Sequence, residues 1–140
     1  MNLTRIVLAA LAAFVAYFAL GGLAFTRPFM KNEFMKYPAV YRPEEAIRAV
    51  MPLGMAAMFV AMIVLTVLYA MISPGDSGAA AGAKFGALIG VFAVCAFVLH
   101  NHVNLNIGWT LTLQQAVAYF VEWLVVGVVI GLVYRPPAMH

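Results

Sequence analysis

The sequence predicts an all-α, polytopic membrane protein: a four-helix bundle with a short interfacial amphipathic helix between the first and second spans. Hydrophobic residues make up 66% of the 140 residues, and only 9% are charged. A soluble domain carries about 25% charged residues, because its surface faces water. The apolar residues also lie in long uninterrupted runs, which is typical of helices that cross a bilayer. We therefore expect a single transmembrane domain over residues 1–140.

The positive net charge does not indicate a nucleic-acid partner. The eight Lys and Arg residues that produce the charge of +3 are spread over loops and helix ends. Cations at such places anchor a membrane protein to lipid headgroups, so the lipid bilayer is the expected partner. Cys95 is the single cysteine, so no internal disulfide can form.

The first span is expected over about 6–25, an uncharged apolar run between Arg5 and Arg27. About 20 residues at a rise of 1.5 Å cross the ~30 Å hydrocarbon core. The apolar region of a secretory signal peptide is shorter, about 7–15 residues. The run is therefore expected to be a retained transmembrane helix.

The second span is expected over about 50–72, within a helix that begins near Pro43. Proline followed by acidic residues suits the first helical turn. Pro52 is expected to kink this helix near the membrane entrance. The turn residues of 73–78 are expected to end it.

The third and fourth spans are expected over about 82–99 and 111–134. Lys84 lies close enough to the start of the third span for its ammonium group to reach the headgroups. The fourth span contains Glu122.

The loop between the first two spans predicts a short amphipathic helix. Pro28 can open a helix that must end before Pro38. Met30, Phe34 and Tyr37 follow at positions i, i+4 and i+7, which places them on one side. We expect this helix to lie in the headgroup plane with its apolar side in the bilayer. A simple connector is favoured over a lipid sensor or a docking surface.

The distribution of cations predicts an orientation. Four spans place both termini on one side of the membrane. The first loop carries more cations than the opposite side: Arg27, Lys31, Lys36, Arg42 and Arg48, against Arg5, Lys84 and Arg135. The positive-inside rule therefore predicts a cytoplasmic first loop and both termini outside.

Two series of glycines predict close helix packing. Gly82, Gly86 and Gly90 share one side of the third span, and Gly127 and Gly131 share one side of the fourth. Because lipid gives helices no hydrophobic reason to associate, small residues that let backbones approach hold them together. A contact within the chain is favoured over homodimerisation.

Glu122 is the most informative residue, because it lies near the middle of the fourth span. Ionisable groups are expensive there and usually face the bundle interior. Thr112, Gln115 and Tyr119 precede it at spacings of three and four, which makes a polar stripe along one side. We expect Glu122 to lie inside the bundle and to be un-ionised at neutral pH.

Tyr17 and Thr66 are the expected hydrogen-bond partners of Glu122. Tyr17 lies at the middle of the first span, at the same depth as Glu122 in the fourth, and Thr66 carries a hydroxyl group in the second span. The functional hypothesis is a proton or cation site, or a pocket for a polar ligand. The alternative is a structural hydrogen bond that fixes helix register.

A second polar cluster follows the third span: His100, His102, Asn104, Asn106 and Trp109. Histidine could ligate a metal, and His100 could be the axial ligand of a haem or a chlorophyll-type pigment. A zinc site needs three or four ligands, however. Asparagine and tryptophan are also typical of interfacial loops. We favour an ordinary hydrogen-bonded loop and expect no cofactor.

The layout resembles that of small four-helix bacterial inner-membrane proteins of unknown function. The resemblance rests on a first helix that ends in Leu20-Gly21-Gly22-Leu23-Ala24-Phe25, an aromatic and basic loop, a glycine-rich third helix, an asparagine-bearing loop and the Gly127-x-x-x-Gly131 pattern. It implies a location in the bacterial inner membrane. It implies no functional residue, because the family has no established activity.

The sequence lacks any complete catalytic motif. It contains no phosphate-binding glycine loop, no HExxH motif and no Ser-His-Asp arrangement. We therefore expect an interaction protein, an accessory or assembly subunit whose partners are other membrane-protein subunits or itself. The alternative is a small transporter or ligand-binding protein that uses Gln115, Tyr119 and Glu122. A pigment-binding subunit or an enzyme is the third hypothesis.

Overall fold

The computed structural model describes residues 2–26, 28–73 and 77–134, and within these ranges it contains helices and no strand. Four helical stretches are long and apolar enough to cross a membrane, which confirms the predicted fold class. Three are single helices: α1 (Leu3–Thr26), α3 (Glu44–Ile72) and α6 (Trp109–Val133). The fourth runs without a break through α4 (Ala79–Ala93), the π-helical η1 (Val94–Leu99) and α5 (His100–Asn104). Arg27, the turn residues 74–76 and Arg135 lie outside the described residues.

The helix ends follow the local sequence, with one exception. α3 begins at Glu44, directly after Pro43, as the sequence indicates. The third span, by contrast, continues as helix through His100 and His102 to Asn104, where a loop was expected. Helical hydrogen bonding satisfies the backbone groups of these residues close to the membrane, which an open loop would leave to water.

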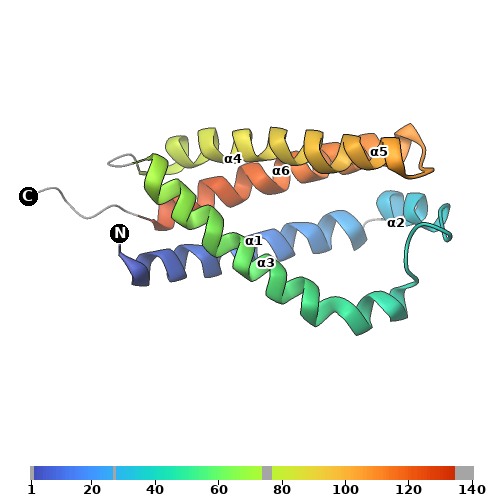
Figure 1. The fold of residues 1–140 in the computed structure, drawn as a ribbon, viewed down its shortest axis with the longest axis horizontal. Coiled ribbons are helices and arrows are strands. Elements are labelled where there is room, and N and C mark those ends of the chain that lie inside the picture. Colours follow the sequence, from blue (N-terminus) through green and yellow to red (C-terminus); the bar gives the residue numbers. More distant parts are fainter. Residues whose placement is uncertain (1, 27, 74–76, 135–140) are drawn as a thin grey trace, which may run out of the picture.

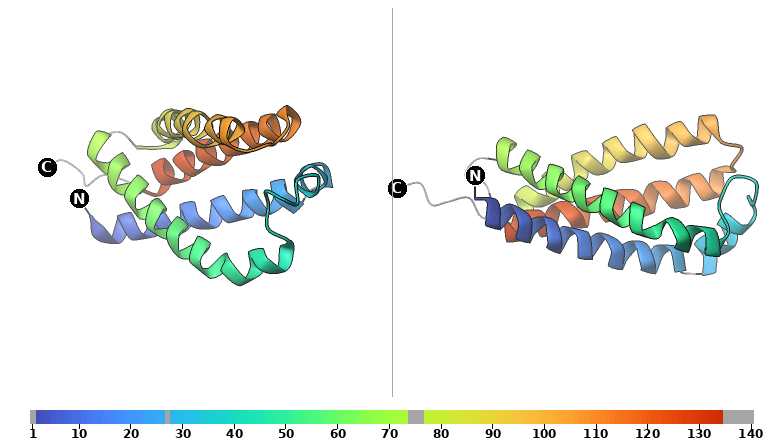
Figure 2. Two further views of the ribbon diagram at one scale, coloured as in Figure 1. Left: turned by 45° about the vertical axis from the view of Figure 1, so that its right-hand side comes forward. Right: turned by 60° about the horizontal axis from the view of Figure 1, so that its bottom comes forward.

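Figure 1 shows the start of α1 and the end of α6 at one end of the bundle and α2 (Pro28–Met35) with α5 at the other. We call these the termini end and the α2 end. α6 contacts α4 and α1, while α3 packs mainly against α1. The two further views in Figure 2 show the same arrangement. α6 is therefore the helix around which the bundle is assembled.

Glycines bring the backbones of α4 and α6 together. A Cβ atom at Gly82 or Gly86 would overlap the backbone of α6, and one at Gly127 or Gly131 would overlap the backbone of α4. The two predicted glycine series thus face each other within one chain. Close backbone approach of this kind supplies the van der Waals contact that stabilises helix pairs in lipid.

The main apolar cluster of the core occupies the half of the bundle nearest the termini end, while Met30, Val98, Ile107 and Leu111 are buried separately at the α2 end. Its buried members on α1 all precede Tyr17, and those on α6 all follow Glu122. The members of the cluster are Ile6, Ala9, Ala10, Ala13, Met62, Tyr69, Phe85, Val126, Ile130 and Tyr134.

α3 takes part in this core only with its second half. Met62, Thr66 and Tyr69 are buried, whereas every side chain from 47 to 57 is exposed. Figures 1 and 2 show the turquoise start of α3 turned away from the other spans, in the part of the helix that contains Pro52. The bundle is therefore tightly packed at the termini end and splayed at the α2 end.

α2 covers part of the splayed end. Its Met30 is 1% exposed, and α2 contacts both α1 and α6. The expectation that the apolar side of this helix lies in the bilayer is therefore wrong for Met30. The end of the bundle offers an apolar surface of its own, and packing on it removes the same area from water.

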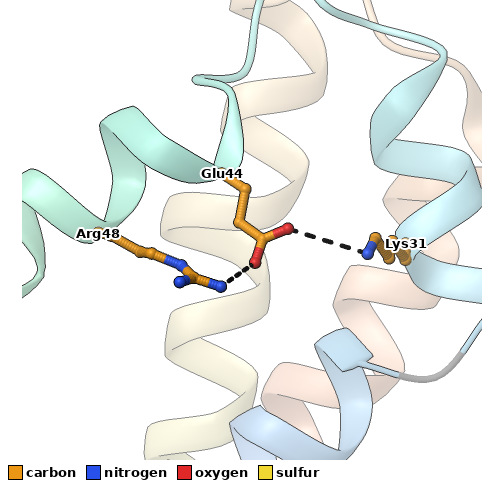
Figure 3. A network of polar contacts seen from close by, with 3 residues as sticks. All are labelled: Lys31, Glu44 and Arg48. Atoms are coloured by element: carbon orange, nitrogen blue, oxygen red, sulfur yellow. Dashed lines mark hydrogen bonds and ion pairs between the residues drawn. The ribbon is translucent and has the colours of Figure 1, made fainter.

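An ion-pair cluster links α2 to the start of α3. Glu44 accepts a hydrogen bond of 2.6 Å from Arg48, and the Lys31 ammonium lies 3.9 Å from its second oxygen. Figure 3 shows the Glu44 carboxylate between the two cations. All three side chains are exposed, so the cluster adds little to stability. It places charged groups at the α2 end, where headgroups would lie.

The glycine contact gives a first prediction. Gly127→Ala should lower the free energy of unfolding by about 1–3 kcal/mol, because the methyl group forces the α4 and α6 backbones apart. Gly54→Ala is the control, since a Cβ there meets nothing within 4 Å. It should be neutral or slightly stabilising. Thermal unfolding of both variants in lipid provides the measurement, and equal effects would contradict the packing described here.

Candidate functional site

Glu122 lies inside the bundle, on the side of α6 that faces α1. Its exposed fraction is 2%. A Cβ atom added to Gly21 of α1 would lie 3.3 Å from Oε1 of Glu122. The missing side chain at Gly21 therefore gives the carboxyl group room against the α1 backbone.

Aromatic side chains surround the carboxyl group. Tyr17 of α1 and Tyr119 of α6 lie close enough to interact electrostatically with Glu122. The ring of Tyr17 also packs on that of Trp123, with a centroid distance of 5.4 Å. The structure thus brings together Glu122, Tyr119 and Tyr17, three of the five residues predicted for the site.

Neither carboxyl oxygen of Glu122 has a hydrogen-bond partner among the described residues. The expected hydrogen bond to Tyr17 or Thr66 is therefore absent. Thr66 instead donates to the backbone oxygen of Met62 in its own helix, at 2.8 Å. A threonine inside a helix can satisfy its hydroxyl locally in this way, so it has no need of a partner on another helix. The indole Nε1 of Trp123 is also buried without a partner.

Polar side chains lead from Glu122 towards the α2 end. Gln115 is half-buried, and its Nε2 donates to the Tyr41 hydroxyl at 3.3 Å. Tyr41 in turn interacts electrostatically with Tyr119. At the start of α6, the Thr112 hydroxyl lies 2.8 Å from Nδ1 of His102. The stripe is thus joined to the segment that connects α2 with α3.

The sequence pattern does not predict the contacts of two residues at this end, Tyr37 and Tyr41. The hydroxyl groups of Tyr37 and Tyr41 tie the connecting segment to the α6 region, since Tyr37 accepts a 2.9 Å hydrogen bond from the backbone N–H of Gly108. The sequence pattern places Tyr37 only in the apolar stripe with Met30 and Phe34. A tyrosine at the membrane interface carries a polar group at the end of an apolar ring, and that property was the available signal.

The same side of α6 is apolar beyond Glu122. Val126 and Ile130 continue the stripe and are at most 1% exposed. Ala10 and Ala13 of α1 are fully buried in the same half. On this side of α6, Glu122 therefore lies at the boundary between the polar stripe and the apolar cluster.

His100 and His102, the two histidines among the described residues, do not form a common site. His100 is exposed, whereas His102 contacts Thr112 and packs against the ring of Trp109 at 4.0 Å. Among the residues that the structure describes, no group of three His, Cys, Asp or Glu side chains could hold a metal ion. Axial ligation of a pigment by His100 stays a prediction, for which the absorption spectrum of the purified protein is the test.

Comparison with known proteins gives a family. The family model described as "Protein of unknown function (DUF1761)" matches residues 8–131, which include most of each spanning helix and the surroundings of Glu122. No curated protein and no solved structure matches the chain.

The tyrosine contacts of the α2 end give a second prediction. Tyr37→Phe removes the acceptor of the Gly108 amide and should cost about 1–3 kcal/mol of local stability, because a partly buried N–H loses its partner. The amide of Gly108 should then exchange with deuterium faster. Tyr41→Phe is the matched control and should leave this amide protected, as its hydroxyl bonds Gln115. If the exchange rate of the Gly108 amide were unchanged in Tyr37→Phe, the hydrogen bond between Gly108 and Tyr37 would not stabilise this segment.

Proposed function

We propose that this chain, which belongs to the DUF1761 family of proteins of unknown function, uses Glu122 to bind a proton, a cation or another small polar ligand. Its four apolar helices fit an integral membrane protein. One observation carries the proposal: a carboxyl group that is 2% exposed has no hydrogen-bond partner for either oxygen among the described residues.

This observation favours a binding role over a structural one. A residue that fixes helix register does so by bonding to a neighbouring helix, and a buried polar group without a partner costs free energy. A carboxyl group in a membrane helix is also costly, and such groups usually mark substrate or proton pathways. The free oxygens of Glu122 are available to a ligand. Tyr17 and Tyr119 can supply hydroxyl groups to orient it.

The proposed role is that of a small transporter or a ligand-binding membrane protein. Glu122 supplies the oxygen atoms that bind the ligand, Tyr17 and Tyr119 line the site, and Gln115 leads to the α2 end. We place the protein in the bacterial inner membrane, with the α2 end in the cytoplasm and both termini outside. The excess of Lys and Arg in the loop that contains α2 supports this orientation.

A specific observation also favours the interaction hypothesis, an accessory or assembly subunit. The side chains of 47–57 in α3 are exposed throughout, although they lie in a spanning helix. Another membrane subunit, or a second copy, could pack on this half of α3. Native mass spectrometry after gentle extraction should then show the chain with a partner or as an oligomer. A monomer alone would count against this role.

The binding proposal gives a third prediction. The infrared spectrum of the protein in lipid should contain a protonated-carboxyl band that shifts in heavy water and is lost in Glu122→Gln. The variant should keep its fold, because the amide has nearly the shape of the acid. Glu45→Gln is the control, since Glu45 is an exposed carboxylate on the same chain. A Glu122 band that never exchanges with solvent would identify a sealed, structural acid instead.

A further inference from the structure

We infer that the ligand of Glu122 is a proton and that this proton reaches the carboxyl group from the α2 end of the bundle only. The inference rests on the proposed binding function, which it specifies in two ways. The observations that carry it are the buried apolar cluster on the termini side of Glu122 and the lack, among the described residues, of a group of metal-binding side chains beside the carboxyl group.

The half of the bundle nearest the termini closes the site on that side. Ala10 and Ala13 of α1, Met62 of α3 and Val126 and Ile130 of α6 are all buried, with exposed fractions of at most 1%. They belong to one apolar cluster. The hydroxyl of Thr66, which is buried in the same half, is already bonded to its own helix. Tyr69 and Tyr134 belong to the same cluster, but most of its side chains are aliphatic, and a charged species that crossed this layer would lose its hydration for few polar contacts.

The half at the α2 end offers polar groups at short intervals. Tyr119 and Gln115 follow Glu122 along one side of α6, and Gln115 bonds the Tyr41 hydroxyl. Tyr41 is half-buried and belongs to the segment between α2 and α3. Met30, Val98, Ile107 and Leu111 are buried in this half. The start of α3, however, diverges from it, and the side chains from 47 to 57 are exposed. These polar side chains of Tyr119, Gln115 and Tyr41 mark the route that we propose from the α2 end to the carboxyl group, and we call it the relay. The link between Tyr119 and Glu122 is an electrostatic interaction and not a hydrogen bond.

The space and the ligand set indicate a proton rather than a larger cation. Oε1 of Glu122 lies close to the α1 backbone at Gly21. Metal cations such as Ca²⁺ and Mg²⁺ take about six oxygen ligands, but the described residues contain no cluster of three acidic or other metal-binding side chains. A proton needs only one lone pair of the carboxylate. A tyrosine hydroxyl can both accept a proton and donate one, which suits a relay.

The chemical step is a simple protonation. A proton from water at the α2 end binds one oxygen of the Glu122 carboxylate and forms the neutral acid, and it leaves by the same route. The titratable groups that face this carboxyl are Tyr17 of α1, Tyr119 of α6 and, beyond Tyr119, Tyr41. Within the described ranges, α3 and α4 contribute none at this level, since Tyr69 and Lys84 lie nearer the termini end.

Single cysteines test the route. In a Cys95→Ala background, the probes are Tyr119→Cys on the relay and Val126→Cys in the apolar layer. Asn32→Cys and Ser77→Cys are exposed references at the α2 end and the termini end. A membrane-impermeant thiol reagent is added to sealed vesicles of one orientation. Tyr119→Cys should react from the same side as Asn32→Cys, and Val126→Cys should react from neither side.

Reaction of Tyr119→Cys from the side of Ser77→Cys would overturn the one-sided route. So would reaction of Val126→Cys, or a folded Tyr119→Cys variant that reacts from neither side. These outcomes leave the binding function intact, because the infrared band of Glu122 tests that function separately.

The identity of the ligand is tested by chemical labelling of the wild-type chain, so this test does not depend on the folding of a variant. Dicyclohexylcarbodiimide, which dissolves in the bilayer and modifies protonated carboxyl groups, should label Glu122 more as the pH falls, and sodium chloride should not change the labelling. Protection by sodium would identify a metal cation and overturn the proton, while the binding function would stand. Absence of labelling at every pH would contradict both.

Discussion

Backbone contact between α4 and α6 decides how α6 is rotated within the bundle. Because Gly127 and Gly131 lie directly against Gly82 and Gly86, the glycine side of α6 is fixed towards α4. The polar stripe occupies a different side of the same helix. It therefore has to face α1, where Gly21 leaves room for the Glu122 carboxyl group. A substitution that opened the glycine contact would rotate or displace the site without touching it.

The bundle combines a rigid half with a loosely packed half. The apolar cluster that joins α1, α3 and α6 lies between Glu122 and the termini end. At the α2 end, α3 diverges, and the buried apolar residues, such as Leu111 and Met30, are accompanied by polar side chains of α6. A carboxyl group at the boundary is shielded from lipid on one side and can reach polar groups on the other. At this position the carboxyl group can be buried from lipid and still exchange protons with water, and a proton-binding carboxyl group in a membrane needs both properties.

The fold could be predicted almost completely from the sequence, because long apolar runs, prolines and glycines each act locally. Glycines spaced four apart predicted which sides of α4 and α6 meet. Burial of Glu122 followed from its depth alone. The hydrogen bonds around Glu122 could not be predicted, because they depend on how each helix is rotated and on whether a side chain bonds its own backbone instead. Thr66, for example, donates to the backbone oxygen of Met62 in its own helix. The contacts of Tyr37 and Tyr41 depend on how a connecting segment folds back, which no periodicity records.

The central claim is that a buried carboxyl group exchanges protons with one face of the membrane. The most direct measurement is infrared difference spectroscopy of the protein in sealed vesicles of one orientation, with an acid step applied to one side at a time. The protonated band that Glu122→Gln removes should grow after a step on the α2 side and stay constant after a step on the termini side. Growth after a step on the termini side, or no response to either step, would contradict the account.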